Sequence, residues 1–221
     1  MATSAAPTTL QIEVISDVVC PWCYIGKRRL EAALALKPDI KASINWRPYF
    51  LNPWIPRQGI DRQTYLKTKF GSAERYGAIA QRVAAAAAME GLRYAPDKIS
   101  RQPNTLDCHR LISWSRGVID AARMKQRLME LYFAEGADLT DADVLVQAAA
   151  DCGMDGDRVR ALLLSNANID DVEGEAAGAQ EAGIDGVPSF IFGGTAMVTG
   201  AQPPEYLAGA IERAAQQHGQ L

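Results

Sequence analysis

Two cysteines separated by two residues stand where one pattern of side chains gives way to another. Before them, Leu10, Ile12 and Val14 alternate with polar residues, a period of two that predicts a β-strand. After Cys20, Pro21 suits the first position of a helix, because its missing N–H has no partner to lose there and its ring fixes φ. The sequence therefore predicts a strand followed by a helix, with Cys20 at the start of the helix.

The predicted position of Cys20 favours its ionised form. The first turn of a helix has unpaired backbone N–H groups and the positive end of the helix dipole, and both stabilise a negative charge. A thiolate is the nucleophile of disulfide exchange. Cys23, one helical turn further on, is near enough to attack a mixed disulfide formed at Cys20 and release the partner. The spacing therefore indicates a redox-active dithiol.

A structural zinc site and a purely structural disulfide are the other uses of such a pair. Tetrahedral zinc needs four ligands, whereas Cys108 and Cys152 are isolated and far along the chain, and the sequence holds only 2 histidines. A disulfide across a two-residue loop would constrain the unfolded chain little. We therefore expect redox chemistry and no metal site.

The composition limits the remaining function classes. The 221 residues are 48% hydrophobic and 22% charged, which suffices for one large core, or for one domain inserted into another. A net charge of −3, with no long cationic run, gives no reason to expect nucleic-acid binding. Neither a signal-peptide pattern nor a run of about 18 apolar residues occurs, so we expect no membrane association and a cytoplasmic protein. A reducing compartment also suits a chain with one catalytic pair of cysteines.

Strand and helix patterns divide the chain into three parts. A second strand is predicted through Ile44, Trp46 and Phe50, and because no hairpin turn precedes it, the two strands are expected to be parallel. From about residue 61 to residue 164, apolar residues recur at helical spacing over a stretch too long for a loop. We therefore predict an inserted helical block after the second strand.

Mixed α/β character returns after this block. A helix ended by Gly183 precedes two short strands, which can form a hairpin across the Gly193-Gly194 turn, and a final helix begins at Pro203-Pro204. We predict an α/β fold whose core is discontinuous, formed by residues 10–56 and 166–217, with residues 57–165 as the inserted all-helical domain.

Four motifs accompany this order of elements. They are the run from Ser16 to Gly26 around the two cysteines, the run from Arg47 to Pro53, Asn104-Thr105 with His109-Arg110-Leu111, and the run from Gly186 to Phe190. The order and the motifs together resemble the DsbA-like thioredoxin superfamily, and most closely its FrnE-like cytoplasmic branch. The resemblance implies a thioredoxin-like core with an inserted all-helical domain, and a thiol–disulfide oxidoreductase that acts as an oxidase, reductase or isomerase.

The resemblance also implies the wall opposite the dithiol. It predicts a cis peptide bond between Val187 and Pro188, which leaves the backbone of Val187 free to pair with an extended substrate or with glutathione. Trp22, between the two cysteines, is expected to contact partners. We expect protein or small-molecule thiols and disulfides as partners, no tightly bound cofactor, glutathione as a candidate co-substrate, and a monomer or homodimer.

Asp17 and His109 are two further titratable side chains. The sequence leaves two roles open for Asp17 and suggests one role for His109. A buried Asp17 could accept the proton of Cys23 as a general base, but the role of ending the strand and forming a turn is favoured for an aspartate here. His109 is expected to hold the helical block by a hydrogen bond. Cys108 and Cys152 share helical stripes with apolar residues and are expected to be packing residues.

Two other function classes compete with disulfide exchange. The layout also resembles that of kappa-class glutathione transferases and 2-hydroxychromene-2-carboxylate isomerases, which generally activate glutathione with a serine where this chain has Cys20. The cysteine argues against that alternative. The third class is a partner-binding module without catalysis, which would use the cleft between the core and the helical block.

Overall fold

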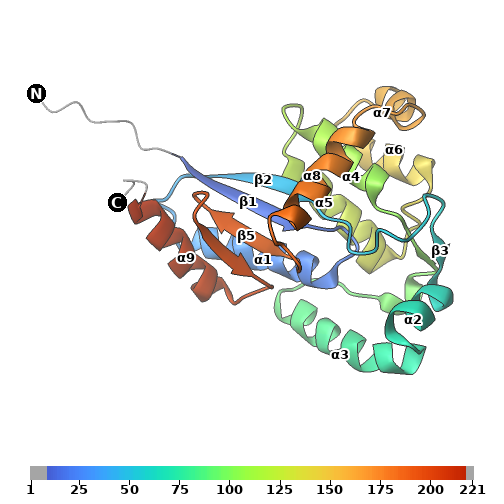
Figure 1. Cartoon of the computed structure of the whole chain (residues 1–221), viewed down its shortest axis with the longest axis horizontal. Helices are drawn as coiled ribbons and strands as arrows, with labels where there is room; N and C mark the ends of the chain where they lie inside the picture. Colours follow the sequence, from blue (N-terminus) through green and yellow to red (C-terminus); the bar gives the residue numbers. More distant parts are fainter. Residues whose placement is uncertain (1–8, 218–221) are drawn as a thin grey trace, which may run out of the picture.

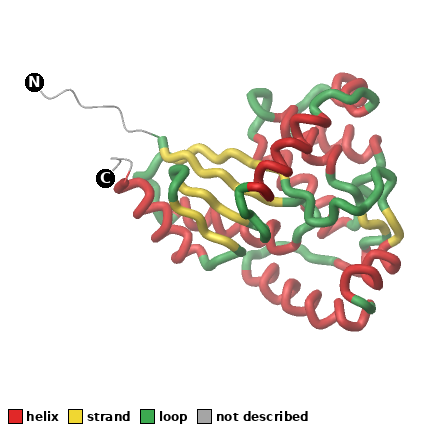
Figure 2. The backbone as a smooth tube through the Cα atoms, in the orientation of Figure 1, coloured by secondary structure: helices red, strands yellow, loops and turns green. Residues whose placement is uncertain are grey.

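The computed structural model describes residues 9–217, and a mixed sheet lies at its centre (Figures 1 and 2). The strand order is β2-β1-β5-β6, with β1 parallel to β2 and antiparallel to β5, and β5 antiparallel to β6. The predicted parallel pair and the predicted hairpin are therefore both confirmed. The strands are β1 (Leu10–Ser16), β2 (Ala42–Pro48), β5 (Ser189–Phe192) and β6 (Ala196–Thr199).

Helices cover both faces of the sheet (Figure 1). On one face, Ile12 and Val14 share a core with the buried stripes of α1 and α9, and on the other Ile15 packs with Ala179 of α8. The period of two along β1 thus places its side chains into two separate apolar layers. The bounds are α1 (Pro21–Ala35), α8 (Ile169–Glu181) and α9 (Pro204–Gln217).

The remaining helices follow β2 in the chain and lie to one side of the sheet (Figure 1). We refer to residues 57–165 as the helical segment. Its largest departures from the prediction are α2 and a ladder of two short antiparallel strands, β3 and β4, which were not predicted. The bounds are β3 (Ile60–Asp61), α2 (Arg62–Phe70), α3 (Ala73–Met89), a 3-10 turn η1 (Pro96–Lys98), β4 (Arg101–Gln102), α4 (Leu106–Ser115), α5 (Ala121–Glu130), a π-helical turn η2 (Leu131–Glu135), α6 (Ala142–Asp151) and α7 (Gly156–Leu163).

One predicted boundary was wrong by two residues. β2 ends at Pro48, so Phe50 lies in the loop beyond it, because a proline cannot donate a backbone hydrogen bond to a sheet. Further along the chain α4 begins at Leu106, and the Asn104 side-chain oxygen accepts a hydrogen bond from the Leu106 N–H at 2.9 Å. The side chain before the helix therefore satisfies an N–H group of its first turn.

Gly26 brings α1 close to the loop that precedes β5. A Cβ atom at this position would lie 2.8 Å from Pro188 Cγ and 3.3 Å from Phe190 Cζ, closer than ordinary packing allows. The glycine thus sets the distance between the helix that carries the two cysteines and the segment that faces them.

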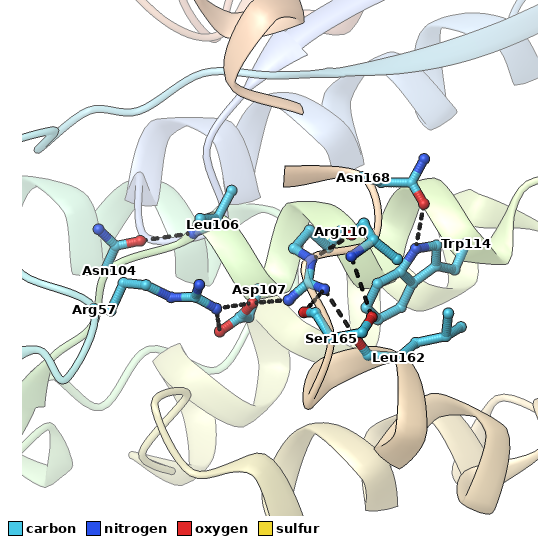
Figure 3. A network of polar contacts seen from close by, with 10 residues as sticks. Arg57, Asn104, Leu106, Asp107, Arg110, Trp114, Leu162, Ser165 and Asn168 are labelled. Atoms are coloured by element: carbon cyan, nitrogen blue, oxygen red, sulfur yellow. Dashed lines mark hydrogen bonds and ion pairs between the residues drawn. The ribbon is translucent and has the colours of Figure 1, made fainter. Parts of the chain in front are cut away.

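Arg110 ties the helical segment to the chain that returns to the sheet (Figure 3). Its side chain is fully buried and donates hydrogen bonds to the carbonyl oxygens of Leu162, Ser165 and Ala167 at 2.7 to 2.8 Å. A further bond, of 2.6 Å, reaches the Asp107 carboxylate. One side chain of α4 therefore fixes the path of the loop that leads into α8.

Candidate redox site

Cys20 lies at the start of α1, as predicted, and faces the loop before β5. It is the N-cap residue, and its carbonyl oxygen accepts hydrogen bonds from the N–H groups of Cys23 and Tyr24 at 3.0 and 3.2 Å. Its thiol donates to the carbonyl oxygen of Val187 at 3.6 Å, and the Val187–Pro188 peptide bond is cis. The structure thus brings together the cysteine and the cis-proline that the sequence placed far apart.

The surroundings of Cys20 favour its thiolate. The hydrogen bond donated by the Cys23 side chain is the largest influence that lowers the pKa of Cys20, and the backbone N–H groups of Cys23 and Trp22 add to it. Burial and the negative charge of Asp17 act in the opposite direction but do not outweigh these hydrogen bonds. Cys20 is therefore suited to be the attacking nucleophile.

Cys23 has the opposite tendency. It is 2% exposed, and burial raises its pKa well above the ordinary value. The hydrogen bond to Cys20 and the charge of Cys20 raise this pKa further. One cysteine is therefore stabilised as a thiolate and the other as a thiol, which is the arrangement that a nucleophile and a resolving residue require.

We expect the two cysteines to be alkylated over different pH ranges. The thiolate fraction rises with pH through each pKa, so a lowered pKa makes Cys20 react at lower pH than free cysteine, which is roughly 3% ionised at pH 7. Cys23 should react only at higher pH. Mass spectrometry of iodoacetamide adducts, from about pH 5 to about pH 10, measures each site separately, with Cys152 as an internal control of raised pKa. Faster labelling of Cys23 than of Cys20 would contradict the assignment.

Asp17 is buried between the sheet and the helical segment. It is 1% exposed, and its carboxylate accepts a hydrogen bond from the Leu51 N–H at 2.8 Å and lies 3.3 Å from His109 Nε2. Burial alone would raise the pKa of Asp17, but the hydrogen bonds from His109, Leu51 and Thr105 outweigh it and lower this pKa. A carboxylate held ionised in this way is a weak proton acceptor, and its contacts fix the loop after β2 and α4 against the end of β1.

His109 reaches this site from α4, in agreement with the hydrogen-bonding role expected for it. Burial lowers its pKa, while the Asp17 carboxylate and the Tyr49 carbonyl act in the opposite direction. Its ring also meets the Phe50 ring edge-on, with centroids 5.6 Å apart. His109 therefore links the helical segment to the loop that follows β2.

Three further side chains surround Cys20. Trp22 is 38% exposed on the first turn of α1. Lys69 of α2 contacts the Asn52 side-chain oxygen and donates to the Leu51 carbonyl at 3.4 Å. Burial lowers the pKa of Lys69, and the negative charges of Cys20 and Asp17 counteract this. An exposed aromatic ring and an ammonium group therefore lie near Cys20.

Two buried lysines lie near one aromatic ring. Lys27 of α1 lies 5.9 Å from the ring centroid of Trp46, and Lys125 of α5 lies 5.4 Å from it. Lys27 is paired with Glu31. Lys125 is 1% exposed, and burial lowers its pKa to about 8.

The other two cysteines are buried, as expected. Cys108 is 0% and Cys152 2% exposed, and burial raises the pKa of both. Their surroundings are those of packing residues. Within residues 9–217, no three His, Cys, Asp or Glu side chains are grouped so that they could hold a metal ion. In the same part of the chain, no helix combines the length and apolar character that crossing a membrane requires.

Sequence reasoning missed Asn52, Lys69, Lys27 and Lys125 as parts of the site. For Lys125 the signal was present, because it stands three residues before Leu128 on the apolar stripe of its helix. A cation in the middle of an apolar stripe is rare unless it has a partner. Asn52 and Lys69 carry no comparable signal, since their roles depend on how the loop after β2 meets α2.

Comparisons with known proteins agree with this geometry. Residues 11–212 match the family of DSBA-like thioredoxin domains. The Bacillus subtilis protein YwbO is 26% identical over 205 residues, which cover 92% of this chain and 96% of YwbO. The crystal structure of the probable DsbA oxidoreductase SCO1869 from Streptomyces coelicolor is similar with a TM-score of 0.85 and 31% identity, over 94% of this chain and 91% of that one.

A third protein shares the fold at lower identity. It is the cytosolic disulfide reductase DsbM from Pseudomonas aeruginosa, in a structure with GSH. DsbM is 15% identical, with a TM-score of 0.65 over 93% of this chain and 99% of its own. At this identity the likeness concerns the fold alone.

Proposed function

Because this chain belongs to the family of DSBA-like thioredoxin domains, we propose that it exchanges disulfides through Cys20 and Cys23. The observation that carries the proposal is the position of Cys20, a nucleophile of lowered pKa at the start of α1 that faces the cis Val187–Pro188 bond. The family supports thiol–disulfide oxidoreductase activity, and this geometry supports the two residues named here.

The proposed reaction has two exchange steps. The Cys20 thiolate attacks one sulfur of a substrate disulfide, forms a mixed disulfide and releases the first thiolate of the substrate. Cys23 then loses its proton and attacks the Cys20 sulfur, which releases the second thiolate and leaves a Cys20–Cys23 disulfide. The substrate is reduced by two electrons and the protein is oxidised by two. The reverse sequence oxidises a dithiol, and the reduction potential of the pair decides the direction.

Substrates of extended shape fit the surroundings of Cys20. The Val187 backbone precedes β5, and the exposed ring of Trp22 supplies an apolar contact beside the nucleophile. We propose protein or small-molecule thiols and disulfides as partners. Glutathione is included as a co-substrate on the strength of the GSH in the DsbM structure, and we extend to this chain the cytosolic location of DsbM.

The test is to trap the first intermediate. In a Cys23→Ser variant the mixed disulfide at Cys20 has no resolving thiol, so we expect covalent adducts with disulfide substrates that only a reductant removes. Non-reducing gels and mass spectrometry detect the adducts and identify the cysteine. Wild-type protein should instead release two thiolates per disulfide consumed.

A Cys152→Ser variant is the control. It keeps both Cys20 and Cys23, so the mixed disulfide is resolved and no adduct should accumulate. The proposal fails if Cys23→Ser traps no substrate and wild-type protein turns over no disulfide. Binding of glutathione without disulfide turnover would favour the transferase or isomerase alternative, and partner binding without either would favour a non-catalytic module.

A further inference from the structure

We propose that Lys125 accepts the proton of Cys23 when Cys23 attacks the mixed disulfide. This inference rests on the proposed function and names the base for its second step. Lys125 belongs to the helical segment and not to the sheet or α1, so the inference gives that segment a direct part in the chemistry.

The position of Lys125 is the first argument. Cys23 and Lys27 lie one turn apart on the same buried stripe of α1, and this stripe faces the core that contains Trp46. The Lys125 ammonium reaches the same core from α5 and lies 5.4 Å from the centre of the Trp46 ring. The charge of Cys23 is the strongest electrostatic influence on Lys125, ahead of those of Asp17, Lys27 and Cys20.

The lack of a hydrogen bond or ion pair is the second argument. Among residues 9–217 neither is found for the Lys125 ammonium, whose contact is the Trp46 ring, although the residue is 1% exposed. A buried ammonium without a counterion is unfavourable, so the neutral amine is stabilised, and a neutral amine is a base. Lys27, near the same ring, is paired with Glu31 and does not share this property.

The other titratable groups near Cys23 are less suited to the role. The Asp17 carboxylate is already bonded to the Leu51 N–H and lies against His109, and its pKa is lowered. The Nε2 atom of His109 is engaged by the Asp17 carboxylate at 3.3 Å.

Lys125 is surrounded by groups from several elements, and all of them bear on its protonation. The negative or ionisable ones are Cys20 and Cys23 of α1 and Asp17 after β1, whereas Lys27 is the opposing cation. The charge of Lys125 in turn acts to lower the pKa of His109 and of Cys108, both in α4.

A small cavity adjoins Lys125. It has a volume of about 10 Å³, room for roughly one water molecule, and is lined by Lys125 together with His109, Trp46, Arg116 and Glu175.

The step balances in atoms and charge. In the mixed disulfide, the neutral Lys125 amine takes the proton from the Cys23 thiol, and the resulting thiolate attacks the Cys20 sulfur. The Cys20–Cys23 bond forms, the bond between Cys20 and the substrate breaks, and the substrate leaves as a thiolate while Lys125 is left as an ammonium. The substrate disulfide is the oxidant.

The order of events favours proton transfer at this stage and not earlier. Before the first step, the Cys20 thiolate stabilises the charged form of Lys125, as the electrostatic influence of Cys20 shows. Formation of the mixed disulfide removes that negative charge. Lys125 then loses a source of stabilisation for its ammonium form, so its pKa falls and a larger fraction is the neutral amine when the second step needs a proton acceptor.

The experiment follows both steps in one reaction. An aromatic disulfide whose thiolate absorbs visible light is mixed with the reduced, full-length protein in a stopped-flow instrument. The first phase reports attack by Cys20, and the second reports resolution by Cys23. In wild-type protein the second phase should accelerate with rising pH, with a midpoint at or below about 8, because Lys125 loses its proton there once the charge of Cys20 is gone.

Lys125→Met removes the base and keeps an apolar stem of similar length. We expect the second phase to slow by about 10- to 100-fold at pH 7, with its midpoint moved to higher pH and the first phase unchanged within about twofold. Lys37→Met is the control, since it removes a lysine that follows the C-terminal end of α1 and pairs with Glu212, and its second phase should stay within about threefold of wild type.

Lys125→Arg separates proton transfer from simple charge stabilisation. Arginine keeps a cation at this position but does not give up its proton, so this variant should be slow like Lys125→Met. A second phase of wild-type speed in either variant overturns the proposal. If wild-type protein itself shows no second phase, the proposed function fails, which is a different outcome from a variant that matches wild type. Circular dichroism identifies any variant that does not fold, and the second variant then decides.

Discussion

Replacement of Cys20 by serine should reduce disulfide exchange by about three orders of magnitude or more, to the rate of the uncatalysed reaction. The hydroxyl of serine stays protonated where the Cys20 thiol is ionised, so the hydrogen bonds that the first turn of α1 and Cys23 offer have no thiolate to stabilise. The lone Cys23 does not substitute, because burial raises its pKa and keeps it a thiol. Turnover of a small aromatic disulfide, measured by absorbance, quantifies the loss.

Cys152→Ala is the matched control for this substitution. This variant replaces a different buried cysteine, the C-cap residue of α6, which lies outside the redox site. Its turnover should stay within about twofold of wild type. Circular dichroism and thermal unfolding show whether each variant is folded. Retention of wild-type turnover in Cys20→Ser would mean that the chemistry resides elsewhere in the chain.

The parts of the fold that depend on local patterns were predictable from the sequence. Alternation through Ile12 and Val14 marked β1, and Pro21 marked the start of α1, because both signals arise from residues close together in the chain. The hairpin across Gly193-Gly194 was equally local. The opposing position of Val187 and Pro188 was different in kind, since only a family resemblance placed it beside Cys20.

The contacts that the sequence did not predict are those between segments far apart in the chain. The pairing of β3 with β4 joins residues about 40 positions apart through two residues on each side, too few to produce an alternating pattern. Lys125 was detectable as a cation on an apolar stripe, but its place near the dithiol follows only from the fold, in which α5 packs against α4 and the Lys125 ammonium reaches the Trp46 ring of β2. The hydrogen bond of His109 was expected, whereas its partner, Asp17, was not identified.

The contacts of Arg110 also join segments far apart in the chain, and the sequence did not predict them. Of the substitutions considered, that of Arg110 is expected to have the largest effect on stability. Its side chain, 0% exposed, binds three carbonyl oxygens of the loop between α7 and α8, and it also stacks on Trp114 at 4.8 Å (Figure 3). Trp114 donates to the Asn168 side-chain oxygen at 2.9 Å, and Asn168 has a left-handed backbone with φ 59°. This loop delivers α8 to the face of the sheet opposite α1.

We expect Arg110→Met to lower the free energy of unfolding by about 3 to 5 kcal/mol. Methionine keeps the apolar stem but leaves the carbonyl oxygens of Leu162, Ser165 and Ala167 without their donor and removes the ion pair with Asp107. Arg110→Lys should recover only a minor part of the loss, because a single ammonium cannot reproduce the planar arrangement of donors. Urea unfolding, followed by circular dichroism, measures the free energy.

Arg57→Met is the matched control on the other side of Asp107. Arg57 donates to both Asp107 oxygens at 2.8 Å, but it is 47% exposed, so its ion pair is screened by water and should contribute less than about 1 kcal/mol. The two arginines share a carboxylate and differ in burial and in their bonds to the loop. If both substitutions had the same small effect, the hydrogen bonds from Arg110 to the loop would not be what holds α8 against the sheet. A loss confined to Arg110→Met would instead show that the path of the loop, and not the charge of Asp107, is what the buried guanidinium stabilises.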